Sequence, residues 1–159
     1  MKHKILFVCM GNICRSPVAE AIMQKLIDDR GLSANFEIDS AGILSYHQGE
    51  KADPRMRQHA ARRGYNVTSI SRPVKTADFD RFDLIIGMDD TNIDDLNDRA
   101  LTASYKAKIH KMTEYSKEYN HTYIPDPYYG GSAGFELVID LLEDACAGLL
   151  ESFDEKSKL

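Results

Sequence analysis

The stretch KILFVCMGNICRSP, residues 4–17, decides the fold of this chain. Lys4 to Val8 form a short apolar run that predicts a buried β-strand. Ser16 followed by Pro17 predicts the start of a helix, because serine is a good N-cap and proline suits the first helical position. A strand that leads through a short loop into a helix predicts an α/β fold.

The same alternation continues along the chain. We expect further strands at 36–38, 84–86 and 107–112, and helices at 16–31, 53–64, 91–99 and 135–153. Alternating strands and helices are typical of a parallel sheet that helices cover on both faces. The polar segment 115–134 is rich in proline and glycine and predicts a long loop, a feature that is often functional in compact domains.

Composition limits the possible classes of protein. The 159 residues, 43% of them hydrophobic, fit a single domain, and a net charge of -5 without a basic stripe argues against nucleic-acid binding. No apolar run approaches the ~20 residues of a membrane helix, and the N-terminal run is too short for a signal peptide. Three cysteines, Cys9, Cys14 and Cys146, do not form a disulfide framework, so we expect a soluble, cytoplasmic protein.

The loop after the first strand has the composition of an anion-binding site. Backbone N–H groups that curl inward at a helix N-terminus attract phosphate, and Gly11 and Asn12 readily adopt the left-handed conformations that such curling needs. Arg15 could grip two phosphate oxygens, and Cys9 at the floor would be a nucleophilic thiolate. The predicted phosphate-binding loop therefore comprises Met10, Gly11, Asn12, Ile13, Cys14, Arg15 and Ser16.

Each of these residues also has a purely structural interpretation. Cys9 could be a small hydrophobic residue at the end of a strand, Arg15 an exposed residue at a helix start, and Cys14 a silent packing residue. The strand, the Gly-Asn pair and the Ser-Pro helix start together favour the phosphate site.

Asp126 is the candidate general acid. Pro125 and Pro127 confine the backbone on both sides of it, and Tyr128 and Tyr129 offer flat apolar surfaces for an aromatic ring. An Asp-Pro pair is also common in ordinary turns. The aromatic residues and the long loop favour the catalytic interpretation, in which the acid protonates a leaving oxygen.

The motifs VCMGNICRSP at 8–17, DSAG at 39–42, MD at 88–89 and DPYY at 126–129 resemble, in this order, those of the low-molecular-weight protein tyrosine phosphatases. The resemblance covers nearly the whole chain and implies one domain over 1–159, with a four-stranded parallel sheet. It implies phosphotyrosine hydrolysis through a cysteinyl-phosphate intermediate, without a cofactor. Cys9 would be the nucleophile, Arg15 the phosphate clamp and Asp126 the general acid and base.

The same resemblance implies supporting roles. Asn12, Ser16 and Ser40 would hold the phosphate loop through hydrogen bonds, and Ser16 would also steady the thiolate. Tyr46 would form one wall of the pocket opposite Tyr128 and Tyr129. Ser69 stands where several family members have a histidine in the network that supports the loop. The implied partners are tyrosine-phosphorylated proteins, bound by a monomer or a weakly self-associating protein.

Other functions fit the residues less well. Arsenate reductases with a similar loop need two further cysteines in the middle of the chain, and phosphoarginine phosphatases carry threonine in place of Ile13. A phosphocarrier would need neither Arg15 nor Asp126, a non-catalytic module should lack one of the three central residues, and no GxxxxGK[ST] stretch indicates a nucleotide site. The five histidines lack ligand spacing, so we expect surface histidines and no metal site.

Cys14 is also a candidate redox partner. It follows Cys9 by five residues in a loop that must curl around a phosphate ion, and curling brings the two sulfur atoms together. A reactive thiolate is readily oxidised to sulfenic acid, which a neighbouring thiol converts to a disulfide. We expect Cys14 to protect Cys9 in this way.

Overall fold

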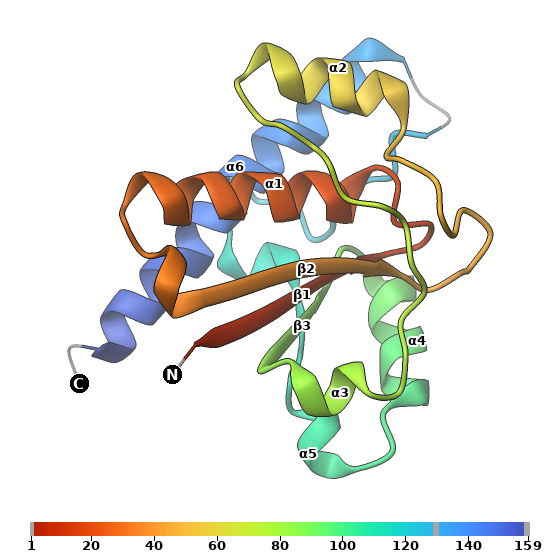
Figure 1. Ribbon diagram of the computed structural model, residues 1–159, viewed down its shortest axis with the longest axis vertical. Helices are drawn as coiled ribbons and strands as arrows, with labels where there is room; N and C mark the ends of the chain where they lie inside the picture. The colour runs from red at the N-terminus through yellow and green to blue at the C-terminus, as the bar shows by residue number, and fades with distance from the viewer. Residues whose placement is uncertain (1, 129–130, 158–159) are drawn as a thin grey trace.

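The computed structural model describes residues 2–128 and 131–157, with side chains described through Phe153. Four parallel strands, β1 (His3–Cys9), β2 (Phe36–Gly42), β3 (Leu84–Gly87) and β4 (Ile109–Lys111), form one sheet in the order β2-β1-β3-β4 (Figure 1). This confirms the expected single α/β domain with a four-stranded parallel sheet flanked by helices.

Helices cover both faces of the sheet. The α-helices are α1 (Arg15–Asp29), α2 (Pro54–Arg62), α3 (Asp78–Arg81), α4 (Asp90–Arg99), α5 (Ala103–Lys106) and α6 (Ser132–Ser157), and two 3-10 turns are η1 (Ser33–Asn35) and η2 (Met112–Tyr115). Figure 1 shows α1, α2 and α6 on one side of the sheet and α3, α4 and α5 on the other.

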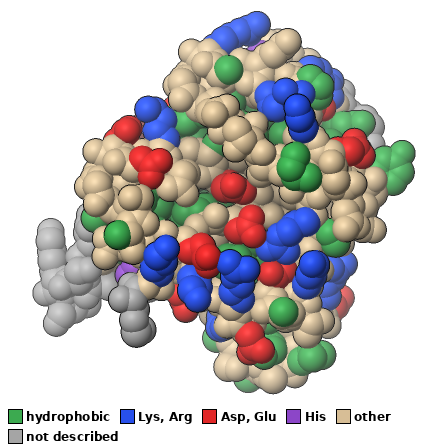
Figure 2. Space-filling view, viewed as in Figure 1, with side chains coloured by type: hydrophobic (Ala, Val, Ile, Leu, Met, Phe, Trp, Pro, Cys, Tyr) green, Lys and Arg blue, Asp and Glu red, His purple; other side chains and the backbone are tan. Residues whose placement is uncertain are grey.

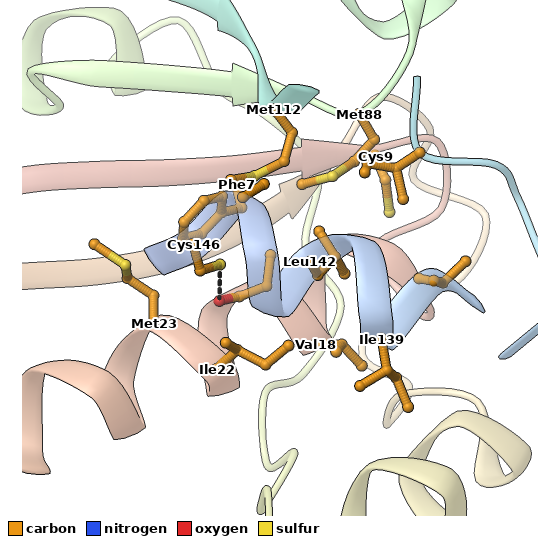
Figure 3. Close-up of a cluster of buried hydrophobic side chains, with 14 of the residues drawn as sticks. Phe7, Cys9, Val18, Ile22, Met23, Met88, Met112, Ile139, Leu142 and Cys146 are labelled. Atoms are coloured by element: carbon orange, nitrogen blue, oxygen red, sulfur yellow. Dashed lines mark hydrogen bonds between the residues drawn. The ribbon is translucent and has the colours of Figure 1, made fainter. Parts of the chain in front are cut away.

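The central strand β1 explains why both faces are buried. Its side chains alternate, so that Ile5 and Phe7 pack into the core beneath α1 and α6 while Leu6 and Val8 pack into the core on the opposite face. All four are fully buried. Figure 3 shows the first core, where Phe7 and Cys9 of β1 meet side chains of α1 and α6.

Several elements differ from their expected bounds. β2 continues through residues 39–42, because it pairs with β1 as far as Cys9 and Gly42. α1 begins at Arg15, one residue before the expected N-cap. α6 begins at Ser132 and runs past Phe153 to Ser157, and the short helices α3 and α5 were not expected. Tertiary pairing and packing set these bounds more than local propensity does.

The strand order places a binding crevice at one end of the sheet. The chain passes from β1 to β2 on one side, then returns to β3 on the other side of β1. In open parallel sheets, the loops that diverge at such a switch point leave a crevice beyond the carboxyl ends of the strands. The loops after β1 and β3, which begin at Met10 and Met88, therefore flank the site.

Elsewhere, the surface is charged but mixed in sign. Figure 2 shows acidic and basic side chains interleaved across the middle of one face. Among the ion pairs, Arg72 binds Asp39 of β2, as well as Asp78, and Arg81 binds Glu37 of β2. These pairs lie along the edge strand β2. No helix in the described part of the chain is both long and apolar enough to cross a bilayer.

Candidate active site

The loop between β1 and α1 is anchored through its carbonyl groups. The surrounding segments donate a hydrogen bond to each of four carbonyl oxygens: Ile43 N to Cys9 O (3.0 Å), Leu44 N to Met10 O (2.9 Å), Ser71 Oγ to Gly11 O (3.0 Å) and Asp53 N to Ile13 O (2.8 Å). Because a peptide unit carries its N–H opposite its C=O, carbonyl groups that point outward turn the N–H groups of the loop inward.

Within the described residues, the backbone N–H groups of 11–15 have no hydrogen-bond acceptor, and the next one, Ser16 N, donates to Cys9 Sγ at 3.4 Å. Buried backbone donors are nearly always paired. Successive unpaired donors at the N-terminus of α1 are suited to hold an anion.

Asn12 makes the turn that this loop needs. It has a φ of 57°, whereas Gly11 is not in the left-handed region. A Cβ atom at Gly11 would lie 3.0 Å from His47 Cδ2, so a larger residue there would have to displace the imidazole ring. Asn12 is also fixed by its side chain, which donates from Nδ2 to Ser16 Oγ (2.8 Å) and accepts from Arg72 N at Oδ1 (3.1 Å).

Ser16 serves the site and does not cap the helix. Its Oγ lies 3.1 Å from Cys9 Sγ, and no side-chain cap is found at the start of α1, where Cys14 occupies the N-cap position. The expected capping role for Ser16 is therefore wrong. The N–H groups that a cap would satisfy are instead directed at the anion site. Cys9 is 3% exposed, so only a group that enters the pocket can reach its sulfur.

Arg15 is buried above the loop and held in one orientation. Its Nη1 donates to Asp89 Oδ2 (2.7 Å) and to the Ile124 carbonyl (3.0 Å). Burial opposes its charge, but the negative charges of Cys9 and Asp89 outweigh burial and raise the pKa of the guanidinium. Its Nε has no partner among the described residues, so the Nε edge of the guanidinium remains available to a ligand.

Asp126 lines the same pocket as Cys9 and Arg15. Its Oδ2 lies 3.7 Å from Arg15 Nη2, and its Oδ1 accepts a hydrogen bond from Tyr128 N at 3.0 Å. The segment is anchored at Ile124, whose N–H donates to the Met88 carbonyl at 2.8 Å. The Asp126 side chain is 44% exposed, in contrast to the buried Arg15.

These groups surround a pocket of about 350 Å³. It is lined by Cys9, Met10, Gly11, Ile13, Cys14, Arg15, Leu44, Tyr46, His47, Asp126 and Tyr128. Tyr46 is 82% exposed at the rim, with its ring 4.8 Å from that of His47, which in turn is 6.3 Å from Tyr128. The third expected wall residue, Tyr129, lies outside the described residues.

The support of the loop comes partly from residues that were not expected. Ser40 Oγ donates to Glu20 Oε1 on α1 (2.6 Å), so among the described residues its side chain is bonded to the helix that follows the phosphate loop. Ser69 Oγ is buried without a partner among the described residues. Ser71 and Arg72, two and three residues further along the chain, make the bonds to Gly11 and Asn12 instead.

Sequence patterns missed other residues of the site. Asp89 was quoted only as part of the MD motif and was given no role, but it binds Arg15 and caps α4 by accepting from Asn92 N (2.8 Å). Its position just after β3, at the switch point, was the available signal for that role. His59 is buried against Glu136, so the expectation of surface histidines is wrong for this residue, whereas the partly exposed His47 lines the pocket. In the residues that the structure describes, no cluster of three or more His, Cys, Asp or Glu side chains is arranged to hold a metal ion.

Comparisons with known proteins agree with this geometry. A family model for low molecular weight phosphotyrosine protein phosphatases matches residues 4–159. The low molecular weight phosphotyrosine protein phosphatase of Homo sapiens is 38% identical over 148 residues, covering 92% of this chain and 93% of the human protein. The crystal structure of a protein tyrosine phosphatase from Entamoeba histolytica matches with a TM-score of 0.95 and 51% identity, covering 99% of this chain and 100% of that one. That of a drosophila arginine phosphatase matches with a TM-score of 0.88 and 34% identity, covering 96% and 98%.

Proposed function

Since the chain belongs to the low-molecular-weight phosphotyrosine protein phosphatase family, and is a protein tyrosine phosphatase, we propose that it acts through a cysteinyl-phosphate intermediate. Cys9 is the nucleophile, Arg15 the phosphate clamp and Asp126 the general acid and base. The observation that carries this proposal is that the unpaired N–H groups of 11–15 and the unpaired Nε of Arg15 belong to the same loop and pocket as the Cys9 sulfur.

In the first step the Cys9 thiolate attacks phosphorus, and the bond between phosphorus and the tyrosyl oxygen breaks. The inward N–H groups and Arg15 hold the three equatorial oxygens as charge redistributes. Asp126 gives its proton to the departing phenol oxygen, which therefore leaves as a neutral phenol.

In the second step a water molecule attacks the phosphocysteine. The Asp126 carboxylate takes a proton from this water, inorganic phosphate forms, and the sulfur of Cys9 leaves as a thiolate. The Ser16 hydroxyl, 3.1 Å from Cys9 Sγ, can donate to the sulfur as its charge returns. Asn12 keeps that hydroxyl in place by donating to its oxygen.

The pocket supports tyrosine-phosphorylated proteins as the substrate class. The rings of Tyr46 and Tyr128 line its entrance, and an aryl ring between them would gain apolar contact that the short side chain of phosphoserine cannot make. One solved relative is an arginine phosphatase, so phosphoarginine is the nearest alternative. The apolar Ile13 in the pocket lining favours an aryl group over a guanidinium.

The direct test compares peptides that carry phosphotyrosine, phosphoserine or phosphoarginine in the same sequence, assayed side by side. We expect the highest kcat/KM for phosphotyrosine, and a higher value for phosphoarginine would overturn the substrate assignment.

Rapid acid quench during turnover should trap phosphate on Cys9. Quantitative absence of that adduct during a pre-steady-state burst would instead indicate direct attack by water.

We also propose that Cys14 is a redox partner of Cys9. Both are buried free thiols, and both line the pocket. Burial raises the pKa of the Cys14 thiol, and the negative charges of Asp53 and Cys9 add to the shift. Cys14 is therefore a neutral thiol while Cys9 reacts. Peroxide oxidises Cys9 to the sulfenic acid, and the Cys14 sulfur then displaces its hydroxyl as water to form the disulfide.

A further inference from the structure

The start of α2 is attached to the phosphate loop by a residue that the proposed mechanism does not use. Asp53 is 7% exposed, and its N–H donates to the Ile13 carbonyl at 2.8 Å. Its Oδ1 caps the helix by accepting from Arg55 N at 2.8 Å. The first turn of α2 therefore keeps a fixed position relative to the phosphate loop.

From this turn Arg55 reaches the opposite loop of the site. Its Nε and Nη2 bind the two oxygens of Asp53 at 3.2 and 3.0 Å, and Nη2 also donates to the Tyr128 carbonyl at 2.9 Å. Its guanidinium lies over the ring of Phe135, 4.8 Å from the centroid, and 5.6 Å from that of Tyr128. One planar group thus joins α2, the segment that carries Asp126 (residues 124–128, the acid segment) and the start of α6, which Figure 1 shows beside α2.

The acid segment, residues 124–128, is bonded at both of its ends, and these bonds orient the general acid. Tyr128 N donates to Asp126 Oδ1, while Tyr128 O accepts from Arg55. At its other end the segment is fixed by Ile124, between Met88 and Arg15. Asp126 therefore lies in a short segment whose backbone is bonded on both sides of it. Its own side chain forms only a 3.7 Å ion pair with Arg15, and a bound phosphate group would compete with Asp126 for this arginine.

Arg55 itself does not meet the substrate site. It is not among the described residues that line the pocket, and its side chain is 48% exposed. Burial acts to raise the pKa of Asp53, but hydrogen bonds from Arg55 outweigh burial and lower it. The pair is thus charged at neutral pH, and its effect on the reaction must pass through the backbone that it holds.

We propose that Asp53 and Arg55 form a clamp that sets the position of Asp126 over the phosphate loop, with Arg55 as a positioning residue for proton transfer to the leaving group. The inference rests on the proposed role of Asp126 as general acid. Lysine cannot replace Arg55, because a single ammonium cannot bind both carboxylate oxygens, reach the Tyr128 carbonyl and lie flat over the Phe135 ring.

The test uses a series of aryl phosphates whose leaving phenols differ in acidity. kcat/KM includes every step up to the departure of the phenol, so it reports the proton transfer. Arg55→Lys should lower kcat/KM by roughly tenfold for phosphotyrosine, a fraction of the full worth of general acid catalysis, and by less than about twofold for the most acidic phenol. Asp53→Asn keeps a capping side chain and should give a smaller effect in the same direction. Arg62→Lys, an exposed arginine at the far end of α2, is the matched control and should leave the series unchanged.

The double variant separates failure of this inference from failure of the proposed function. If Asp126→Asn alone leaves the dependence of kcat/KM on the acidity of the phenol unchanged, Asp126 is not the general acid, and this part of the proposed function is wrong. If Asp126→Asn makes kcat/KM depend more steeply on the acidity of the phenol and Arg55→Lys does not, the proposed clamp is refuted. In the Asp126→Asn background, Arg55→Lys should cost no more than about twofold further, because both variants remove the same step. An equal loss for every phenol, or a full additional tenfold loss in the double variant, would show that Arg55 acts on binding or on the fold instead.

Discussion

The two loops that meet over the pocket are held in different ways. In the phosphate loop, Asn12, Arg15 and Ser16 are at most 2% exposed, and four loop carbonyls are bonded to three separate parts of the chain. In the acid segment, the Asp126 side chain is 44% exposed and the backbone is held near Ile124 and Tyr128. The difference matches the two tasks that we propose: charge stabilisation works best with dipoles that need not reorganise, whereas an acid must reach first a phenol and then a water molecule.

Removing the nucleophile from the rigid loop should have the largest effect. Cys9→Ser should lower kcat by at least about 10⁴, because a hydroxyl is a far poorer nucleophile at neutral pH. The N–H groups and Arg15 remain, so tungstate should still bind measurably by calorimetry. Turnover within tenfold of the wild type would refute the covalent mechanism, and loss of tungstate binding would show that the thiolate helps to shape the loop.

Removing the acid from the more exposed segment should have a smaller and more selective effect. Asp126→Asn should lower kcat/KM for phosphotyrosine by roughly 10² to 10⁴, the usual worth of general acid catalysis. Activated aryl phosphates should lose much less, since their leaving groups need no proton. Equal losses for all leaving groups would assign Asp126 a purely structural role.

Asn12 tests how far the rigid loop depends on its backbone. With a φ of 57°, Asn12→Ala should destabilise the fold by about 1 to 2 kcal/mol more than Asn12→Gly, which tolerates that conformation. Both variants lose the bonds to Ser16 and Arg72, so both should lose activity by roughly tenfold or more. Urea unfolding measures the first difference and kcat/KM the second. Equal stability of the two variants would mean that the loop relaxes to another conformation.

The two loops also differ in how much the sequence could predict. Cys9, Arg15 and Asp126 were predicted because each has informative neighbours within a few residues, such as the strand before Cys9 and the prolines beside Asp126. The residues that hold the two loops in place, Arg72 and Arg55, were not predicted. Arg72 binds Asn12 across 60 positions of sequence, and Arg55 binds Tyr128 across 73, and local pattern does not give the register of such contacts. Ser16 shows the opposite error, where a reliable local rule for N-caps was overridden by the needs of the anion site.

Glu20 tests the support behind the rigid loop. Burial raises its pKa to about 7, against the lowering effect of its bond with Ser40. Because the folded pKa lies above the unfolded one, its stabilising effect is complete below the unfolded pKa and is lost as pH rises through about 7. Glu20→Gln should remove this dependence and raise the free energy of unfolding at alkaline pH by about 1 to 3 kcal/mol. Urea unfolding between about pH 5 and pH 8 measures it, and wild-type and variant curves that stay parallel would contradict the prediction.

Cys14 should have the smallest effect on basal turnover, although it lies within the rigid loop. Cys14 is buried but makes no proposed contact with the reacting atoms, so Cys14→Ser should keep kcat/KM within about threefold of the wild type.

The wild type and the Cys14→Ser variant should differ only after peroxide treatment. The wild type should recover with a thiol reductant, because a disulfide to Cys14 has protected Cys9 from further oxidation. The variant should not recover, and mass spectrometry should find sulfinic or sulfonic acid at Cys9. Cys146 supplies the matched control, since it is fully buried in the core with its sulfur directed at the Ala19 carbonyl (Figure 3), and Cys146→Ala should leave the recovery unchanged. Full recovery of the Cys14 variant would mean that this cysteine only packs the loop, and that the reactive thiolate is protected by the closed geometry of the site itself.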